Sequence, residues 1–565
     1  MTDVSTGKNL RRLAQATQLH QAGALDDAEA LYAAILRETP DDPVALINGG
    51  SLALARHDVA TALARLTRAA RVAPRNAIAQ GNLGFALLQA GRPGDALAAL
   101  DRSVALQPDH AQAHNNRGIA LAHLGRGDDA RRAFSRALEL DPRARDAAVN
   151  LGDLAARDGD AERAMAYFDR ALAIDPTSVP ARTGRGFALA LAGDGTLALD
   201  ALQAVVKEHP DAHAAWKTLG AVANWYWQHE TAEQAFRSAM RLEADDDEAG
   251  FGVASTLLAR GRYADGFAAF ERRREGIGSS SARFVRWPAW DGAPRAGTLL
   301  VYAEQGLGDV VQFARFLQLA RTRVQRLVLL LDGYWQSLAS LLESADGVDR
   351  VVTTEDALGD ERIVARASLL SLPHVLGADP ASMARGAYLQ APPERRIAWA
   401  ERLSTCAQPR VGLAWSVFAR SDYGYVTRHK SIPAAALAPL LAVPGVSFVT
   451  LQPGPAGDPA SLGAASARVI DLRDHLHDFG DTAALIAGLD LVIAPDTAVT
   501  HVAGALGVPV WMLDRYNSCW RWRHPADGAT AAWYDTLRIF RQTRFGDWSG
   551  PVAQAAAALG SRAAG

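Results

Sequence analysis

The chain has 565 residues, which is enough for two or more domains with sizeable cores. A formal net charge of −3 and the lack of basic runs with interleaved aromatic residues exclude a general attraction to nucleic acid. With two cysteines, Cys406 and Cys519, a disulfide scaffold and a cysteine-rich metal site are excluded. The N-terminal stretch 1–21 is not typical of a signal peptide, and no apolar run reaches the roughly 18 residues of a membrane span. We therefore expect a cytoplasmic protein that does not span a membrane.

Prolines recur every 34 residues through the first half of the chain, and this is the period of the tetratricopeptide (TPR) repeat. Each such repeat is a pair of helices, and stacked pairs form a superhelix with a concave face. The pattern predicts an α-solenoid of about eight repeats over residues 9–275, with left-handed glycines at the turns between helices. The prolines are Pro40, Pro74, Pro108, Pro142, Pro176 and Pro210; a small residue recurs at Ala28, Ala62, Ala96, Ala130, Ala164, Ala198 and Ala232; a bulky one follows at Tyr32, Leu66, Leu100, Phe134, Phe168, Leu202 and Phe236.

An asparagine occupies the same position of the first helix in four successive repeats, and we expect it on the concave face. A side-chain amide both donates to and accepts from a peptide backbone, so a row of amides suits an extended polypeptide. The alternative is that asparagine is simply frequent at this position of the repeat. A similar choice applies to residues 225–227, Trp-Tyr-Trp, which form either a contact patch or part of the core of the last repeats. The asparagines are Asn48, Asn82, Asn116 and Asn150.

The pattern changes after a junction at residues 276–297. Short apolar runs then alternate with helical stretches, which is typical of parallel, doubly wound α/β sheets. We predict one Rossmann-like domain over residues 298–395 and another over residues 408–562, with a ligand-binding cleft where the carboxyl ends of their strands meet. The predicted strands are 298–303, 326–331, 348–353, 410–415, 447–451, 469–472, 489–494 and 508–513, and the predicted helices are 308–323, 334–344, 433–441, 478–489 and 497–506.

One segment of this half, Leu489–Pro509, places polar residues where an apolar strand gives way to a helix. The free N–H groups and dipole at such a helix start suit a phosphate. Asp496 and Thr497 lie at that start, where they can cap the helix or touch ligand hydroxyls, and His501 lies one turn further on. The alternative is an ordinary helix cap followed by a core histidine.

A second segment, Ala303–Phe313, has a glycine turn between a strand and a helix. Gly306 and Gly308 permit close approach of the backbone to a ligand. Asp309 would lie at the mouth of the cleft, where a carboxylate can accept a proton from an attacking hydroxyl. The alternative is that Asp309 only caps the helix, a common position for aspartate.

A third segment gathers basic residues after the first strand of the second domain. Arg428, His429 and Lys430 precede a helix, and a cation there can neutralise a diphosphate leaving group in place of a metal ion. Ser416 ends the preceding strand and can donate to a phosphate. The alternative is a solvated basic loop.

In this order, the segments AEQGLGD, GLAWS, KSIP, DFGDTAALIAGLDLVIAPDTAVTHVAGALGVPVW, WRW and WYDTLRIFRQ resemble those of bacterial TPR-containing glycosyltransferases. The second half is similar to the heptosyltransferase-like (family 9) enzymes of the GT-B fold. The resemblance implies that Asp309 is the catalytic base and that Lys430 contacts the donor phosphate. It also implies that Asp496, Thr497 and His501 form the donor-binding loop. The family needs no metal ion and carries a glycine where this chain has an alanine after Asp-Thr.

The resemblance predicts an enzyme that transfers a sugar from a nucleotide-sugar donor to Ser or Thr hydroxyls of a protein held by the repeats. Residues 298–395 would serve the acceptor and residues 408–562 the donor, with Gly308 and Ser416 also at the donor. Transfer would be metal-independent and would invert the anomeric centre. The similarity to flagellin-modifying TPR glycosyltransferases makes flagellin a candidate acceptor. The alternatives are a transferase acting on lipopolysaccharide core or another glycan, and a TPR scaffold whose GT-B half does not turn over.

Overall fold

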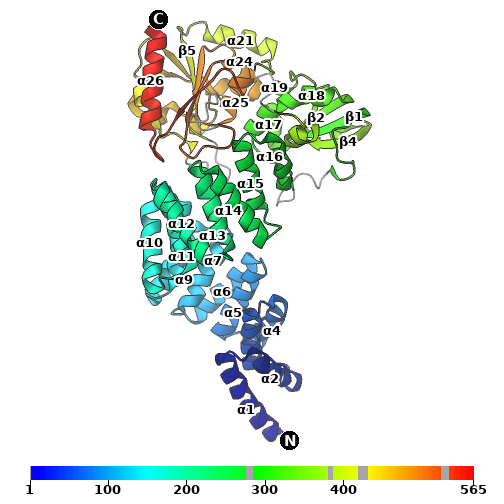
Figure 1. Cartoon of the computed structure of the whole chain (residues 1–565), viewed down its shortest axis with the longest axis vertical. Coiled ribbons are helices and arrows are strands. Elements are labelled where there is room, and N and C mark those ends of the chain that lie inside the picture. Colours follow the sequence, from blue (N-terminus) through cyan, green and yellow to red (C-terminus); the bar gives the residue numbers. More distant parts are fainter. Residues whose placement is uncertain are drawn as a thin grey trace. The chain divides into compact units, whose positions relative to one another are not determined.

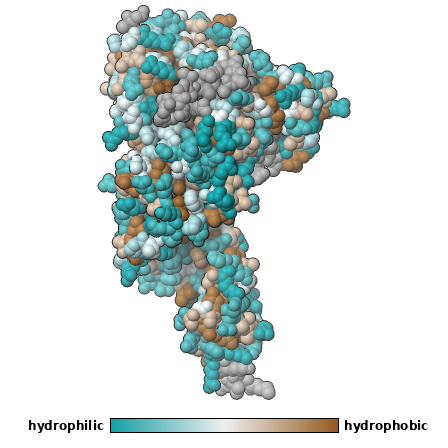
Figure 2. Space-filling model, viewed as in Figure 1, coloured by the Kyte–Doolittle hydropathy of each residue, from teal (hydrophilic) through white to brown (hydrophobic). Residues whose placement is uncertain are grey.

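The computed structural model describes residues 2–274, 284–359, 361–379, 386–417, 430–522 and 533–564. The chain divides into two compact units, Met1–Ala192 and Gly193–Gly565, and each is described by itself. Among the described residues, no helix is both long and apolar enough to cross a membrane. On the face drawn in Figure 2, the coloured hydrophobic residues lie scattered among hydrophilic ones.

The first unit is a succession of helices joined by short turns, coloured from blue to cyan in Figure 1. The alanines of the repeat are fully buried, and the bulky residues four positions later are at most 6% exposed. In several repeats a glycine of the first helix faces the bulky side chain: a Cβ at Gly152 would lie 2.7 Å from Phe168. The predicted α-solenoid is therefore confirmed. Its helices here are α1 (Thr2–Gln21), α2 (Leu25–Glu38), α3 (Pro43–Ala55), α4 (Val59–Val72), α5 (Ala77–Gln89), α6 (Pro93–Leu106), α7 (Ala111–His123), α8 (Gly127–Leu140), α9 (Arg145–Arg157), α10 (Ala161–Ile174) and α11 (Val179–Ala192).

The second unit begins with further repeat helices and continues into the α/β half. The helices are α12 (Gly195–Glu208), α13 (His213–Trp225), α14 (His229–Leu242), α15 (Asp247–Ala259) and α16 (Tyr263–Phe270), followed by the short η1 (Glu271–Arg274). Across both units, the turn glycines have the predicted positive φ angles. They are Gly23, Gly91, Gly125, Gly159, Gly193 and Gly261.

The α/β half contains two sheets, and every pairing between neighbouring strands is parallel. The four-stranded sheet of the first α/β domain has the order β3-β2-β1-β4, and the six-stranded sheet of the second has the order β10-β9-β8-β5-β6-β7. The two sheets confirm the predicted α/β fold class. The strands are β1 (Arg295–Tyr302), β2 (Val324–Leu330), β3 (Arg350–Val352), β4 (Ile363–Ser368), β5 (Arg410–Leu413), β6 (Ser447–Thr450), β7 (Val469–Ile470), β8 (Leu491–Ala494), β9 (Val510–Asp514) and β10 (Leu537–Arg541).

Apart from α21 and α26, the α-helices described in the α/β half have eight residues or fewer. The stretch 308–323, predicted as one helix, is divided by a 3₁₀ turn, and the predicted helix 334–344 begins with another. The α-helices are α17 (Leu307–Phe313), α18 (Leu317–Arg321), α19 (Ala339–Leu342), α20 (Leu372–Leu376), α21 (Pro393–Leu403), α23 (Ala438–Leu441), α24 (Phe479–Ile486), α25 (Ala498–Ala505) and α26 (Ser549–Ala564). The 3₁₀ segments between them are η3 (Ala314–Phe316), η4 (Gly333–Leu338), η5 (Asp356–Leu358), η6 (Leu369–Ser371), η9 (Ala434–Leu437), η10 (Pro455–Gly457), η11 (Pro459–Arg468) and η12 (Arg473–His475).

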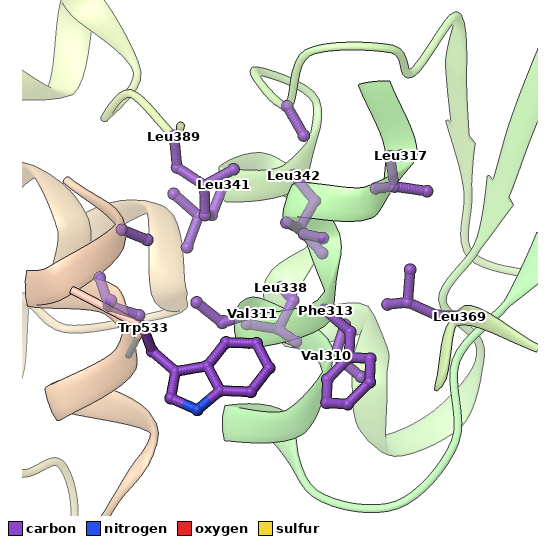
Figure 3. Packing of buried hydrophobic residues seen from close by; sticks show 14 of the residues in the cluster. Val310, Val311, Phe313, Leu317, Leu338, Leu341, Leu342, Leu369, Leu389 and Trp533 are labelled. Atoms are coloured by element: carbon purple, nitrogen blue, oxygen red, sulfur yellow. The ribbon is translucent and has the colours of Figure 1, made fainter. Parts of the chain in front are cut away.

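One hydrophobic cluster contains residues of both α/β domains and passes through α17 and α25, whereas two further clusters lie within single domains. Figure 3 shows Trp533 of the second domain beside Val310, Val311 and Phe313 of α17. The rings of Trp533 and Phe313 lie 6.2 Å apart. At the same place, a Cβ on Gly308 would lie 2.8 Å from His501 Cδ2. The domains are thus in direct contact where the sequence predicts a ligand site, and Gly308 permits this close packing.

Candidate functional site

Asp309 lies in the first turn of α17, directly after the loop that follows β1. Its Oδ2 accepts a hydrogen bond of 2.9 Å from the backbone N–H of Gly306, so it caps the helix. Its other oxygen forms an ion pair with Arg521. In the same loop, Gln305 has a φ of 62°, a left-handed conformation that is strained for a residue with a side chain. Strain of this kind is concentrated at ligand-binding and catalytic loops.

Arg521, which the sequence interpretation did not assign, joins the two α/β domains at this point. It follows β9 in the second domain and reaches across to Asp309 in the first. Its Nε donates to Gln312 Oε1 at 2.6 Å, and its guanidinium lies 4.5 Å from the ring centroid of Trp520. Burial lowers the pKa of Arg521, but Asp309, Cys519 and Asp496 together outweigh this, so the net pKa is raised and the group stays charged. Arg521 is the central residue of the WRW motif, Trp520–Trp522, which is the sequence signal that could have identified it.

Lys430 and Asp496 form a second ion pair, with 2.7 Å between Nζ and Oδ2. Asp496 lies between β8 and α25 and is 9% exposed. Burial raises the pKa of Asp496, but the charges of Lys430 and, to a smaller extent, His501 hold it below its ordinary value. The carboxylate is therefore ionised near neutral pH, and the predicted phosphate-binding cation is already neutralised by a neighbouring side chain.

His501 is buried one turn into α25, and its two ring nitrogens face different groups. Nδ1 lies 2.9 Å from Tyr534 Oη, and Nε2 lies 3.9 Å from Asp496 Oδ1. The Trp522 ring packs on the imidazole at 5.4 Å between centroids. Burial lowers the pKa of His501 to about 4, although Asp496 opposes the shift. The imidazole is thus neutral at pH 7 and can exchange a hydrogen bond with Tyr534.

Of the two roles that the sequence leaves open for Asp496 and Thr497, capping of α25 through their side chains is not observed. Thr497 occupies the cap position without a side-chain cap bond, and the Asp496 carboxylate contacts Lys430 instead. Within the described part of the chain, Thr497 Oγ1 is buried without a hydrogen-bond partner. An unsatisfied buried hydroxyl is costly, and a ligand hydroxyl or phosphate oxygen is one group that can satisfy it.

Ser416 follows β5, and neighbouring side chains accept hydrogen bonds from the backbone at this point. Its N–H donates to Gln452 Oε1 at 2.9 Å, and the N–H of Val417 donates to Ser431 Oγ at 3.0 Å. Gln452 was not singled out from the sequence. Arg428 and His429, which the sequence groups with Lys430, lie outside the described residues.

The structure therefore brings together five residues at the junction of α17 and α25. They form two carboxylate–cation pairs and a neutral imidazole: Asp309 with Arg521, Asp496 with Lys430, and His501. A phosphate binding here would compete with Asp496 for Lys430 and with Asp309 for Arg521. The arrangement can supply two cations to a leaving diphosphate and one carboxylate to an attacking hydroxyl.

A buried ion cluster anchors the loop before Asp309 to the end of the repeats. The Arg273 side chain in η1 is 3% exposed and pairs with Glu271 at 2.8 Å and with Glu304, the second residue after β1. Ser371 Oγ donates to Glu271 at 2.9 Å. Since Glu304 precedes Asp309 by five positions, the last repeat and the candidate base are structurally connected.

The pH dependence of stability should report the buried His501. Its folded pKa of about 4 lies below the ordinary 6.5, so the unfolded chain takes up the proton first as the pH falls. The free energy of unfolding should therefore decrease by about 2 kcal/mol between pH 7 and pH 5 through this group. The lowered pKa of Asp496 does not add to this change, because its contribution is lost only below the ordinary carboxyl pKa of 3.8.

Urea unfolding of the wild type and of His501→Gln at pH 7 and pH 5 checks this expectation. The variant should lose less stability than the wild type over this interval. Equal losses in the two proteins would show that other groups account for the pH dependence.

The four asparagines of the repeats take part in contacts within the solenoid. The amide groups of three of them donate to the first helix of the preceding repeat: Asn48 to Thr17 at 3.4 Å, Asn82 to Ser51 at 2.8 Å and Asn150 to Asn115 at 2.9 Å. Asn116 is 6% exposed and accepts from Gln112 at 3.0 Å. These contacts give the asparagine row a role between repeats, which the period alone did not indicate.

Two single substitutions separate this role from acceptor binding. Asn82→Ala and Ser51→Ala each remove the same hydrogen bond, which is worth roughly 0.5–1.5 kcal/mol. We expect both to lower the thermal midpoint, and only Asn82→Ala to raise the KM for a protein acceptor. Thermal melts and transfer at subsaturating acceptor measure the two effects. An unchanged acceptor KM in Asn82→Ala would restrict this asparagine to contacts between repeats.

One group of three potential metal ligands occurs among the described residues, and it lies in the repeats. Atoms of His213, Glu243 and Asp246 come within 4.8 Å of one another. Lys217 Nζ lies 3.2 Å from Asp246 Oδ2, so a protein cation already faces that carboxylate. His213 begins α13, and Glu243 and Asp246 lie in the turn between α14 and α15, so the group does not belong to the α/β domains.

Comparison with known families matches both halves of the chain. Three models of the tetratricopeptide repeat match the first half. One matches residues 48–109 and 124–179, another matches residues 83–149, and the third matches residues 155–222. The model of glycosyltransferase family 9 (heptosyltransferase) matches residues 477–540, which include β8, α25 and β9 with Asp496 and His501. The chain thus combines TPR repeats with a family 9 glycosyltransferase segment, and this match supports a glycosyltransferase.

Individual proteins are also similar to parts of this chain. Protein FlbA of Caulobacter vibrioides is 27% identical over 425 residues, which are 64% of this chain and 69% of FlbA. A TPR protein of Parabacteroides merdae is 18% identical, with a TM-score of 0.38 over 44% of this chain and 98% of its own. A thermophilic TPR protein of Thermus thermophilus is 26% identical, with a TM-score of 0.29 over 32% of this chain and 98% of its own.

Proposed function

We propose that this protein transfers a sugar from a nucleotide-sugar donor to Ser or Thr hydroxyls of a protein acceptor held by the TPR repeats. The observation that carries the proposal is the convergence of Asp309, Arg521 and the Lys430–Asp496 pair at the start of α25, inside or beside the segment matched to family 9. The repeats support a protein acceptor, because stacked helix pairs offer extended binding surfaces. Flagellin is the candidate acceptor to test first.

The proposed reaction is a single displacement with inversion at the anomeric carbon, in a GT-B arrangement. The acceptor oxygen forms a bond to that carbon as the bond to the donor phosphate breaks. Asp309 takes the hydroxyl proton, which requires its carboxylate to release Arg521. The negative charge that develops on the nucleoside diphosphate is neutralised by Lys430 and Arg521. Thr497, with its unsatisfied hydroxyl, and Ser416 are proposed to contact the donor.

Donor turnover should persist in EDTA. Two protein cations, Lys430 and Arg521, can neutralise the leaving diphosphate at this site, so a divalent ion is not required. The measurement is release of nucleoside diphosphate before and after chelation and dialysis. Loss of turnover in EDTA that magnesium or manganese restores would contradict a metal-independent mechanism.

Deletion of the gene, with analysis of flagellin and lipopolysaccharide from the same cells, tests the function. We expect flagellin of the deletion strain to lose mass in units of one sugar. Unchanged flagellin with a truncated lipopolysaccharide would favour the glycan acceptor instead. Intact glycans of both kinds, with no donor turnover by the purified protein, would favour a TPR scaffold.

We also propose a cytoplasmic location. Cys406 and Cys519 are free in the structure, which suits a reducing compartment. Fractionation of cells that express the tagged chain tests this, and recovery in the periplasm would contradict it.

A further inference from the structure

The turn that joins α13 to α14 differs from most other turns of the repeats. Glycine takes the left-handed backbone at this position in six turns, whereas here Trp227 takes it, with a φ of 61°. A bulky side chain is strained in this conformation because its Cβ crowds the backbone. Such strain persists where surrounding contacts outweigh it. The contacts made by Trp227 and its neighbours therefore indicate what the turn does.

Residues 225–227, here called the aromatic turn, pack on the second α/β domain. They neither extend as a separate contact patch nor lie only in the core of the repeats, which were the two sequence interpretations. All the contacting residues lie in the unit Gly193–Gly565. The Arg541 guanidinium lies 4.9 Å from the ring centroid of Trp227, the rings of Tyr226 and Tyr516 lie 5.5 Å apart, and Trp225 stacks on Phe545 at 6.4 Å.

Arg541 transmits this contact to the segment that carries Arg521. Residues 515–522, here called the site loop, follow β9. Arg541 Nε pairs with Asp514 at 2.8 Å, where the loop begins, and Arg541 Nη2 donates to the Trp522 carbonyl at 2.8 Å, where it ends. Asp514 is 1% exposed and also accepts from Ser518 Oγ at 2.9 Å. One guanidinium therefore contacts the chain on both sides of residues 515–521.

The site loop in turn delivers side chains to the candidate site. Arg521 pairs with Asp309, and Cys519 Sγ lies 3.9 Å from Asp496 Oδ2. A shift of the loop would thus displace the cation from the candidate base. A connected series of contacts therefore leads from the repeat formed by α13 and α14, through Arg541 and the site loop, to Asp309.

We propose that the aromatic turn is a positioning element that holds the site loop so that Arg521 stands at Asp309. The last repeats would then complete the catalytic site as well as present an acceptor to it. The catalytic consequence rests on the proposed function, whereas the holding of the loop does not. The competing explanation is that the aromatic turn only stabilises the packing of the repeats.

The substitution Trp227→Gly tests the proposal, and His57→Gly is its matched control. His57 occupies the same turn position, with a φ of 59°, between α3 and α4. Glycine relieves the backbone strain in both variants, but only Trp227→Gly removes the ring that faces Arg541. Amide hydrogen exchange of residues 515–522 and nucleoside diphosphate release are measured in the full-length proteins.

For Trp227→Gly we expect faster exchange of the site loop and a kcat lowered about three- to thirtyfold, the range set by losing a partly buried cation–π contact. The KM for the protein acceptor should not change. His57→Gly should match the wild type in all three measurements. Trp227→Phe, which keeps a ring over Arg541, should recover most of the loss.

Unchanged exchange of the site loop in Trp227→Gly would overturn the proposal, and so would faster exchange with unchanged kcat. A reduced thermal midpoint with normal kcat would assign the turn to stability alone. If the wild-type protein turns over no donor, the proposed function fails, and the exchange comparison by itself decides whether the aromatic turn holds the loop.

Discussion

Replacing Asp309 by Asn is expected to reduce sugar transfer by about 10²–10⁴-fold, the range that general base catalysis contributes. The amide oxygen can still accept from the Gly306 N–H, so the cap of α17 should be kept. What is lost is the basic oxygen that would take the acceptor proton. Transfer to intact acceptor protein, measured with saturating donor, gives the rate.

The ion pair with Arg521 makes a control necessary, because Asp309→Asn also removes the partner of a buried cation. Asp309→Glu keeps the negative charge and the basicity while it displaces the carboxylate, and should retain more activity than Asn. Donor affinity, measured by calorimetry, should stay close to the wild-type value in both variants. Near wild-type transfer by Asp309→Asn, with normal donor affinity, would remove Asp309 from the chemistry.

The solenoid was predictable because each repeat builds its core from nearby residues in a constant register. Ala130 and Phe134, for example, recur at the same repeat positions as Ala28 and Tyr32, and all four are buried. The 34-residue period does not predict hydrogen bonds between successive repeats, because the residues that form them differ from one repeat to the next. Asn150 donates to Asn115, whereas Asn82 donates to Ser51, because the residue that would correspond to Ser51 for Asn150 is Ile119.

The α/β half was predictable where strands are apolar throughout. All eight predicted strands are present with shifted ends, but β4 and β10 were missed. Strand β4 carries Arg366, a charged residue that is 8% exposed and whose backbone bonds to Pro288 and Trp290. Strand β10 has a mixed burial pattern at the edge of its sheet. Backbone hydrogen bonds from the junction residues Pro288 and Trp290 help to hold β4, and the local composition of the strand does not reveal them.

For the candidate site, the sequence indicated which residues lie there, but it did not indicate which of them form ion pairs with one another. Asp309 and Asp496 were found because polar residues at the carboxyl ends of parallel strands converge. The partner of Asp309 is 212 positions away in the chain, in a tryptophan-rich loop that has no periodic signal of its own. Such pairings follow from how the two domains pack, and a local pattern does not record that.

Replacing Lys430 by Met is expected to reduce donor turnover by about 10²–10³-fold, the loss found when one group that stabilises transition-state charge is removed. It should also lower stability, because Asp496, 9% exposed, would keep a charge without its partner; breaking a buried pair in this way costs roughly 3–5 kcal/mol. Nucleoside diphosphate release and urea unfolding measure the two effects separately.

The double variant Lys430→Met, Asp496→Asn distinguishes a phosphate ligand from a structural counter-ion. With the buried carboxylate neutralised, the free energy of unfolding should return toward that of the wild type. Turnover should stay as low as in Lys430→Met, because the cation that faces the diphosphate is still missing. Asp496→Asn alone, which keeps Lys430, measures how much of that loss is due to Asp496. Recovery of turnover together with stability in the double variant would show that Lys430 serves only to neutralise Asp496.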